Sequence, residues 1–294
     1  NNFNGYRWQT PNLTNKEGDY LRADADVFQL FFEGDFGELF PRLDSDDTGA
    51  LDLGFSVGRQ PLFFQEGIMI NDVVDAIGIT RNNLVFNEAT NIRTTAVWGW
   101  DEIHRGAGPT NRRRESAHLY ALFTSIDFPK TTVDFDLGYI SDDENSLYLG
   151  NRQIIREGGD QFNAGLSFVQ RLGHINTAFR FNHSEQTSGH DTIHSDSGSV
   201  FLAEASWTPP HGYDLGYATL FGVNDSYQSL ARDPAAGGPL GRVGILFASP
   251  GIGFVGSAIE NTTDHDSFGG AIGYQKFFED QRQQLILEVG GRTD

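Results

Sequence analysis

Apolar and polar residues alternate over long stretches of this chain. The segment 131–143 reads TTVDFDLGYISDD, in which every second residue is apolar and aspartate or glycine stands between them. Side chains two residues apart on a strand share a face, so this period predicts a strand with one apolar and one acidic face. Two environments remain open. In a soluble sandwich the apolar face meets a second sheet, whereas in a membrane barrel it meets lipid and the acids line an aqueous lumen.

The same alternation recurs along the chain and predicts about 15 strands of roughly 8–12 residues each. Short connections such as DFPKT, RLG and SPG alternate with long polar ones such as SDDENSLYLGNRQIIREGGD. Soluble sandwiches use Greek-key connections, whereas short turns at one end and long loops at the other are typical of outer-membrane barrels. Towards the end of the chain, the predicted strands cover 213–223, 242–248, 252–260 and 268–278.

These patterns predict an all-β fold. We expect residues 1–294 to form a single transmembrane antiparallel up-and-down β-barrel, incomplete at one or both ends. Short periplasmic turns, long extracellular loops and roughly 16–18 strands would leave room for an aqueous channel. Aromatic residues near the predicted strand ends fit interfacial girdles, although a sandwich core would use them equally: Trp98, Trp100, Tyr139 and Phe221 near the long loops, and Phe128, Trp207, Tyr213 and Phe277 near the short turns.

Composition narrows the function further. The net charge of −19 argues against nucleic acid as a partner, because a binding surface must neutralise phosphates. The chain has no Cys, which excludes disulfides and thiolate metal sites. No apolar run approaches the roughly 20 residues of a spanning helix, so a helical membrane protein is excluded. No signal peptide is visible, and we interpret the chain as mature or trimmed at both ends.

One short motif adds a resemblance to a known family. GRQPLFFQEG follows an alternating strand and contains Gly58, Arg59 and Gln60. It resembles the G-R-Q segment of the alginate-export and related porin-like barrels, and the overall architecture resembles Gram-negative outer-membrane porins. The resemblance implies the barrel fold and a channel role. The chain differs from that family in the charge expected for its lumen. An exporter of a polyanion implies a basic lumen, whereas this lumen is predicted to be acidic.

The face opposite the apolar stripe is predicted to line the pore. Rings of carboxylates favour cations, and acids outnumber bases here, so we expect a weak cation preference. Alternatively, the acids pair with arginines across strands and only hold the wall together. Tyr120 is assigned to the same face as the predicted pore-lining residues, which are Asp24, Asp26, Asp52, Arg93, His118, Asp134, Asp136, Arg180, Glu204 and Asp214.

The segment 61–75 carries many apolar residues for a loop, together with Glu66, Asp72 and Asp75. We expect it to fold into the barrel as a constriction loop. The alternative is that it extends the strands above the membrane.

Two loops could bind ions. His190, Asp191, His194 and Asp196 could bind a divalent cation, although such a loop is more often merely solvated surface. The run 112–114 of three arginines could bind lipopolysaccharide phosphates or pair with neighbouring acids. No catalytic motif is present, and no enzyme activity or resident cofactor is expected.

The function predicted from the sequence is passive diffusion of small hydrophilic solutes or ions across the bacterial outer membrane. The partners would be the lipid bilayer and lipopolysaccharide, with the chain a homotrimer or a monomer. Two other functions remain open. The barrel could be a sheath around a partner such as an electron-transfer cytochrome or a lipoprotein, or the chain could be a soluble β-rich binding protein.

Overall fold

The structure is a computed structural model. It describes residues 28–40, 42, 52–105, 112–114, 117–143, 145–149, 152–157, 159–188, 197–210, 212–233, 236, 240, 266–278 and 281–293.

The fold is all-β, as predicted, and is dominated by one 13-stranded sheet. All of its strands except β15 follow one another in a single antiparallel path, and β15 (Ala231–Arg232) pairs parallel with β3. In spatial order the path is β1 (Leu30–Asp35), β2 (Leu53–Phe64), β3 (Ile70–Phe86), β4 (Ala89–Asp101), β7 (His118–Asp127), β8 (Thr131–Ser141), β11 (Gln161–Leu172), β12 (Ile175–Gln186), β13 (Ser197–Trp207), β14 (Leu215–Asp225), β16 (Ser267–Phe278) and β17 (Gln283–Thr293).

Four short strands form two separate hairpins. β5 (Ile103–Arg105) pairs with β6 (Arg112–Arg114), and β9 (Asn145–Leu149) pairs with β10 (Arg152–Glu157). Within the described ranges the helical elements are one turn of α-helix, α1 (Phe36–Leu39), and one 3₁₀ turn, η1 (Gln65–Gly67). No helix within the described residues is long and apolar enough to cross a membrane.

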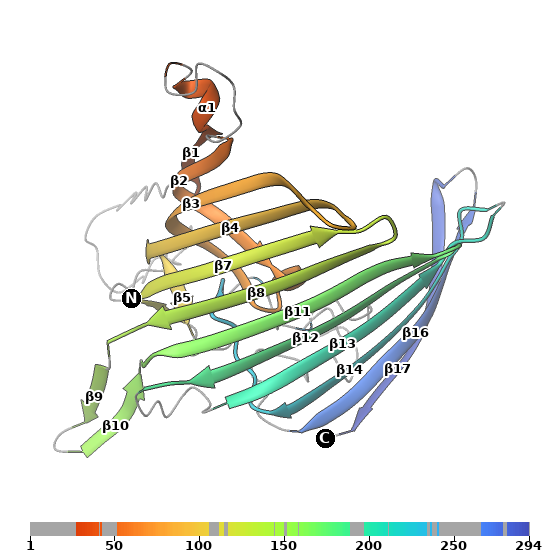
Figure 1. The fold of residues 1–294 in the computed structure, drawn as a ribbon. Helices are drawn as coiled ribbons and strands as arrows, with labels where there is room; N and C mark the ends of the chain where they lie inside the picture. The colour runs from red at the N-terminus through yellow and green to blue at the C-terminus, as the bar shows by residue number, and fades with distance from the viewer. Residues whose placement is uncertain are drawn as a thin grey trace, which may run out of the picture.

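The sheet curls into a trough but is not closed (Figure 1). β1 and β17 form its two edges, and they run in opposite directions because every step along the path is antiparallel. The path in the described residues holds twelve strands. The roughly 16–18 strands expected for the whole barrel stay a prediction, because residues 1–27 and 241–265 lie outside the described residues.

Connections of different length lie at the two ends of the sheet. The short-turn end carries the tight links 87–88, 128–130 and 173–174, whereas the long-connection end carries 102–117, 142–160 and 226–266. This is the predicted alternation, with two exceptions. The link 36–52 is long at the short-turn end, and 65–69 is short at the other end.

The predicted strand order is wrong after β14. We expected the strands 242–248 and 252–260 to lie between 213–223 and 268–278. Instead, β14 pairs directly with β16, from Leu215 opposite Gln275 to Val223 opposite Ser267. No strand can intervene, because each strand in a sheet has only two lateral neighbours. The segment 241–265 lies outside the described residues.

The two faces of the sheet have the reverse of the usual polarity. On β8, Phe135 is 47% exposed whereas the neighbouring Asp136 is 4% exposed. The outer face carries a band of exposed apolar side chains, and buried polar side chains lie on the inner face. The outer band includes Phe168, Phe179, Phe201, Leu220, Ile272, Leu287 and Val289, and the buried inner residues include Asn163, Ser167, Arg180, Asn182 and Ser184.

Glycine allows one long connection to lie on the inner face. A side chain at Gly198 of β13 would overlap the backbone of Ser226 and Tyr227, which follow β14. By contrast, nothing lies within 4 Å of the Cβ position of Gly291 on β17.

We therefore predict that Gly198→Ala lowers the free energy of unfolding by about 1–3 kcal/mol, because the backbone of residues 226–227 must shift. Gly291→Ala is the matched control and should change it by less than about 0.5 kcal/mol. Urea unfolding followed by tryptophan fluorescence measures both values. Equal stability of the two variants would contradict the described position of residues 226–227.

Candidate functional site

The candidate site is the inner space of the sheet, and a hairpin of the sheet itself enters it. Residues 60–64 of β2 pair with 70–74 of β3, but neither segment pairs with β1 or β4, whose ladders stop at Arg59 and Asp75. These strand ends and the 3₁₀ turn between them therefore project from the wall, which is the main sheet, into the inner space. We call residues 60–74 the lumen hairpin.

One side of the lumen hairpin packs against the wall formed by β4, β7 and β8. Leu62, Met69, Ile70 and Val74 are almost fully buried there, and Phe64 stacks on Phe123 of β7. The wall contributes apolar inner residues at the same place. They are Val97, Leu119, Phe123 and Ile140.

A second inward segment, residues 226–233, binds the tip of this hairpin. We call it the lumen segment. The hydroxyl groups of Tyr227 and Ser229 both donate to the backbone carbonyl of Ile68, at 3.1 and 2.6 Å. The backbone N–H of Leu230 donates to the Met69 carbonyl at 2.9 Å, and the guanidinium of Arg232 donates to the Gly67 carbonyl.

The lumen segment also binds the opposite wall. The Gln228 carbonyl accepts hydrogen bonds from the side-chain amides of Gln161 and Asn163, and its N–H donates to the Ser184 hydroxyl. A second apolar cluster lies beside these hydrogen bonds. In it, Ile68 and Tyr227 pack against the inner faces of β13, β14 and β16. Its wall residues are Val200, Leu202, Phe221, Val223 and Ala271.

Polar contacts hold the hairpin tip. The Gln65 side-chain amide donates to the Asp136 carboxylate at 2.7 Å, and the Glu66 carboxylate lies 3.9 Å from the Arg180 guanidinium. Arg180 also pairs with Glu204 on the neighbouring strand. Gln65 and Glu66 both have a φ of 53°, in the left-handed region that strains non-glycine residues, so the contacts and packing hold a strained turn in place.

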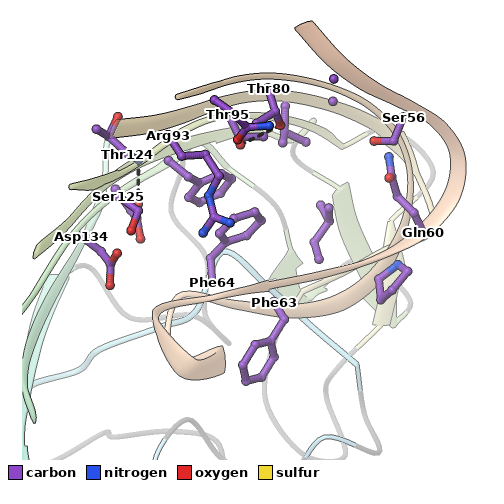
Figure 2. Close-up of a pocket in the computed structure, with 18 of the residues that line it drawn as sticks. Ser56, Gln60, Phe63, Phe64, Thr80, Arg93, Thr95, Thr124, Ser125 and Asp134 are labelled. Carbon is purple, nitrogen blue, oxygen red and sulfur yellow. Dashed lines mark hydrogen bonds between the residues drawn. The ribbon is translucent and has the colours of Figure 1, made fainter. Parts of the chain in front are cut away.

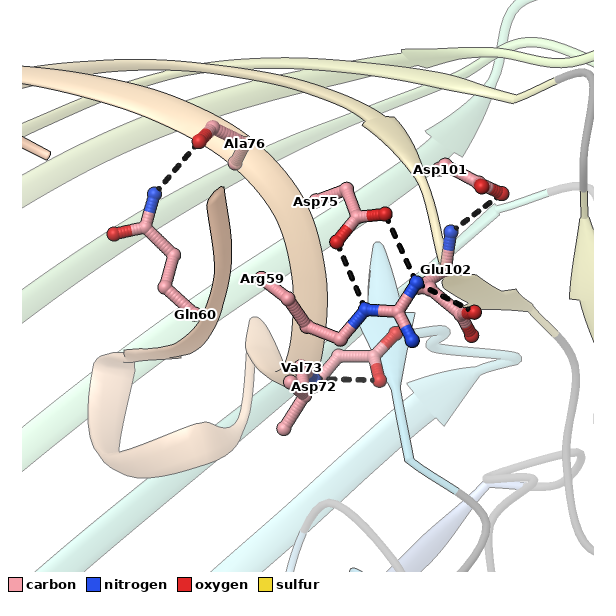
Figure 3. A network of polar contacts seen from close by, with 8 residues as sticks. All are labelled: Arg59, Gln60, Asp72, Val73, Asp75, Ala76, Asp101 and Glu102. Carbon is pink, nitrogen blue, oxygen red and sulfur yellow. Dashed lines mark hydrogen bonds and ion pairs between the residues drawn. The ribbon is translucent and has the colours of Figure 1, made fainter. Parts of the chain in front are cut away.

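The GRQ motif forms the base of the lumen hairpin. Gly58 has a φ of 124°, and a side chain there would overlap the backbone of Leu30 on β1. The Arg59 guanidinium binds the Asp75 carboxylate at 2.9 Å and the Glu102 carboxylate at 2.8 Å, as Figure 3 shows. The Gln60 amide donates to the Ala76 carbonyl at 3.0 Å. The motif therefore anchors the hairpin where it leaves the wall.

A polar hollow of about 920 Å³ lies beside the hairpin, within the short-turn half of the trough. Figure 2 shows hydroxyl, amide and charged groups around it, with the Arg93 guanidinium lying between Phe64 and Asp134. Carboxylates outnumber guanidinium groups in its lining. The acids are Glu33, Asp35, Glu66, Asp134 and Asp136, and the bases are Arg93 and Arg180.

The structure brings together half of the predicted pore-lining residues. Arg93, Asp134, Asp136 and Arg180 line the hollow described above, and Glu204 lines a second, smaller hollow beside it. Asp52 is exposed just before β2, and Asp24 and Asp26 lie outside the described residues.

Two of the predicted pore-lining residues, His118 and Asp214, lie on the outer face, as does Tyr120, which was assigned to the inner face with them. These three assignments are wrong. His118 and Tyr120 share the outer face with Tyr139, while Leu119 and Phe123 of the same strand face inward. Asp214 accepts a hydrogen bond from Tyr274, which also lies on the outer face. The physical reason is that β7 and β14 carry apolar residues on both faces, because their inner faces contact the lumen hairpin and the lumen segment. Phe221, predicted for the outer girdle, is buried for this reason.

The three acids of the predicted constriction loop do not converge. Glu66 reaches the hollow, Asp75 binds Arg59 at the hairpin base, and Asp72 is buried against His104, with 2.9 Å between its carboxylate and the His104 Nδ1. Of the candidate ion sites, His190, Asp191, His194 and Asp196 lie outside the described residues, as do the side chains of 112–114. Among the described side chains, no group of three or more His, Asp or Glu could hold a metal ion.

The sequence pattern did not predict the lumen segment, which lies in the connection 224–241 between the predicted strands 213–223 and 242–248. The available signal was local: Tyr227 and Leu230 are large apolar residues within the polar first part of this connection, NDSYQSLARD. Both are fully buried in the structure.

Comparisons with protein-family models, with curated proteins and with solved structures found no match to this chain.

We predict that Gln65→Ala lowers the free energy of unfolding by about 1–3 kcal/mol, because the buried Asp136 carboxylate then loses its side-chain donor and keeps the Thr124 backbone N–H. In an Asp136→Asn background the same substitution should cost clearly less. A double-mutant cycle measured by urea unfolding gives this difference. Additive effects of the two substitutions would show that the contact contributes nothing.

Proposed function

We propose that this chain forms a transmembrane β-barrel that conducts small hydrophilic solutes or ions across the bacterial outer membrane. The observation that carries the proposal is the reversed polarity of the sheet. A band of exposed Phe, Leu, Ile and Val on one face suits hydrocarbon, and the polar hollow on the other suits water. A soluble protein seldom exposes so large a continuous apolar surface.

In this proposal the barrel closes when the two edge strands, β1 and β17, pair with each other. β1 and β17 run in opposite directions, which is the arrangement that an antiparallel pair requires. Within a bilayer, an open edge would leave backbone N–H and C=O groups without partners at several kcal/mol each, so closure is strongly favoured.

The lumen hairpin narrows the aqueous path, and the charges around the hollow select among ions. The hollow carries more carboxylates than guanidinium groups, so cations are favoured. Arg93 and Asp134 are the groups we expect to act most directly, because both are charged side chains that line the hollow, as Figure 2 shows.

The outer face provides one test. Ile272 on β16 is 70% exposed on this face, and Gln275 on the same strand faces inward. We predict that Ile272→Lys costs about 2–4 kcal/mol of stability in lipid vesicles, since a lysine near the bilayer midplane is poorly solvated. The inward-facing control, Gln275→Lys, should fold as the parent protein does. Gel mobility before and after boiling reports the folded fraction, and equal folding of both variants would argue against a lipid-facing surface.

Ion selectivity provides the second test, by conductance and reversal potential in planar bilayers under a salt gradient. We predict a cation-selective reversal potential for the parent protein. Asp134→Asn should lower the cation-to-anion permeability ratio by about twofold, the effect of roughly 0.4 kcal/mol of charge interaction in a wet lumen. Arg93→Gln should raise it.

The matched control is Asp214→Asn, which removes a carboxylate that accepts a hydrogen bond from Tyr274 on the outer face. It should leave the ratio unchanged. An anion-selective parent protein would overturn the charge argument, and the absence of any conductance would overturn the channel.

A further inference from the structure

The lumen segment crosses the inner space and joins two walls through the hairpin tip. On one side it lies in the apolar cluster of β4, β7 and β8, to which it contributes Leu230 and Ala231. On the other side it contributes Tyr227 to the cluster of β13, β14 and β16. These clusters occupy the long-connection half of the trough, whereas the two hollows lie in the short-turn half.

We propose that residues 226–233 lock the lumen hairpin across the pore, and that the pore is closed at its long-connection end while this lock is engaged. The inference rests on the proposed channel function and goes beyond a narrowed passage. It names the lock residues as Tyr227, Ser229 and Arg232, which act as positioning residues on the hairpin.

The lock acts on the backbone carbonyls of the strained turn. Tyr227 and Ser229 bind the Ile68 carbonyl, and Arg232 binds the adjacent Gly67 carbonyl. The N-cap residue of η1, Phe64, makes no side-chain capping hydrogen bond. The lock donors bind the carbonyls of Gly67, the last residue of η1, and of its C-cap Ile68. Every lock side chain is buried, so water cannot readily replace the donors.

The side chains of the lock also position one another. The Arg232 Nε donates to the Ser229 hydroxyl at 3.2 Å, so one side chain positions the next. Burial lowers the pKa of Arg232 to about 10, and the guanidinium therefore stays charged at neutral pH. Its bond to the Gly67 carbonyl is thus charge-assisted, and such bonds are stronger than neutral ones.

Two glycines on the inner face of the sheet leave space for the lock and the hairpin. Gly198 leaves room for the backbone of residues 226–227 on β13, and Gly138 on β8 leaves room for the side chains of Met69 and Leu230. Lock and hairpin therefore meet a glycine on each of the two walls.

Apolar contact holds the hairpin more strongly than the ion pair at its tip. Fully burying one Leu, Ile or Met side chain is far more favourable than forming a partly exposed ion pair such as Glu66 with Arg180. Opening the pore consequently requires the lock and hairpin to leave these clusters together, and breaking the Glu66 contact alone leaves the pore closed.

The test uses a single cysteine in a chain that has none. Val200→Cys places a thiol at a buried position of β13, in the cluster that contains Ile68 and Tyr227. A thiol reagent should label it slowly while the lock is engaged. Adding Tyr227→Phe with Ser229→Ala removes both hydroxyl donors to Ile68, together with the Ser229 acceptor of the Arg232 Nε–H, and should raise the labelling rate about tenfold or more.

Arg232→Ala should give at least as large an increase, and Arg232→Lys a smaller one, because a lysine keeps a charged donor. Arg171→Ala is the matched control. Arg171 also donates to a backbone carbonyl, that of Gly173, but in an exposed turn, and its loss should leave the labelling rate unchanged. Gel mobility checks that each variant is folded.

The same proteins are then measured in planar bilayers. Faster labelling together with a several-fold higher conductance or open fraction in the lock variants supports the proposal. Unchanged labelling overturns the lock, whatever the conductance. Faster labelling with no conductance in any variant overturns the channel function and with it the claim that the lock closes a pore. Faster labelling with parental conductance overturns the closing role alone.

Discussion

The outer face of the sheet exposes a continuous band of Phe, Leu, Ile and Val side chains, and the account depends on what this band contacts. Removing each such side chain from water is worth about 1.5–3 kcal/mol, so the summed cost of leaving the band in water would exceed the usual net stability of a protein. A hydrocarbon environment removes this cost. It also explains why the polar side chains, Asn163, Ser167 and Asn182 among them, lie on the opposite face.

In the proposed arrangement, with lipid outside, the inner space would hold both water and the chain's own segments. The lumen hairpin leaves the wall where the ladders to β1 and β4 stop, and the Arg59–Asp75–Glu102 cluster holds its base. Two apolar clusters then hold its tip together with the lumen segment. The inner space is thus divided into a packed half at the long connections and a polar half at the short turns, where ions would be selected.

The sequence predicted the fold well where one strand face is wholly apolar. β8 shows this, since Phe135 and Leu137 face outward and Asp134 and Asp136 inward. Prediction of the faces failed on β7 and β14, where Phe123 and Phe221 face inward because they pack against inward-folded segments. An alternating pattern shows that the two faces of a strand differ, but not which face is the inner one. Where the inner space is packed with protein, both faces of a strand carry apolar residues, and the pattern no longer distinguishes them. The lumen segment itself has no periodicity, and its partners in the lumen hairpin lie more than 150 residues away in the chain, as in the bond from Tyr227 to Ile68.

The most direct measurement of the central claim is the contact between the outer face and lipid. A single tryptophan placed at Phe179, on the outer face of β12, would report it in a chain whose four native tryptophans are replaced by phenylalanine. In vesicles of lipids brominated along the acyl chains, the account predicts strong quenching of its fluorescence and weak quenching by aqueous acrylamide. Strong quenching by acrylamide with none by the brominated lipids would contradict it.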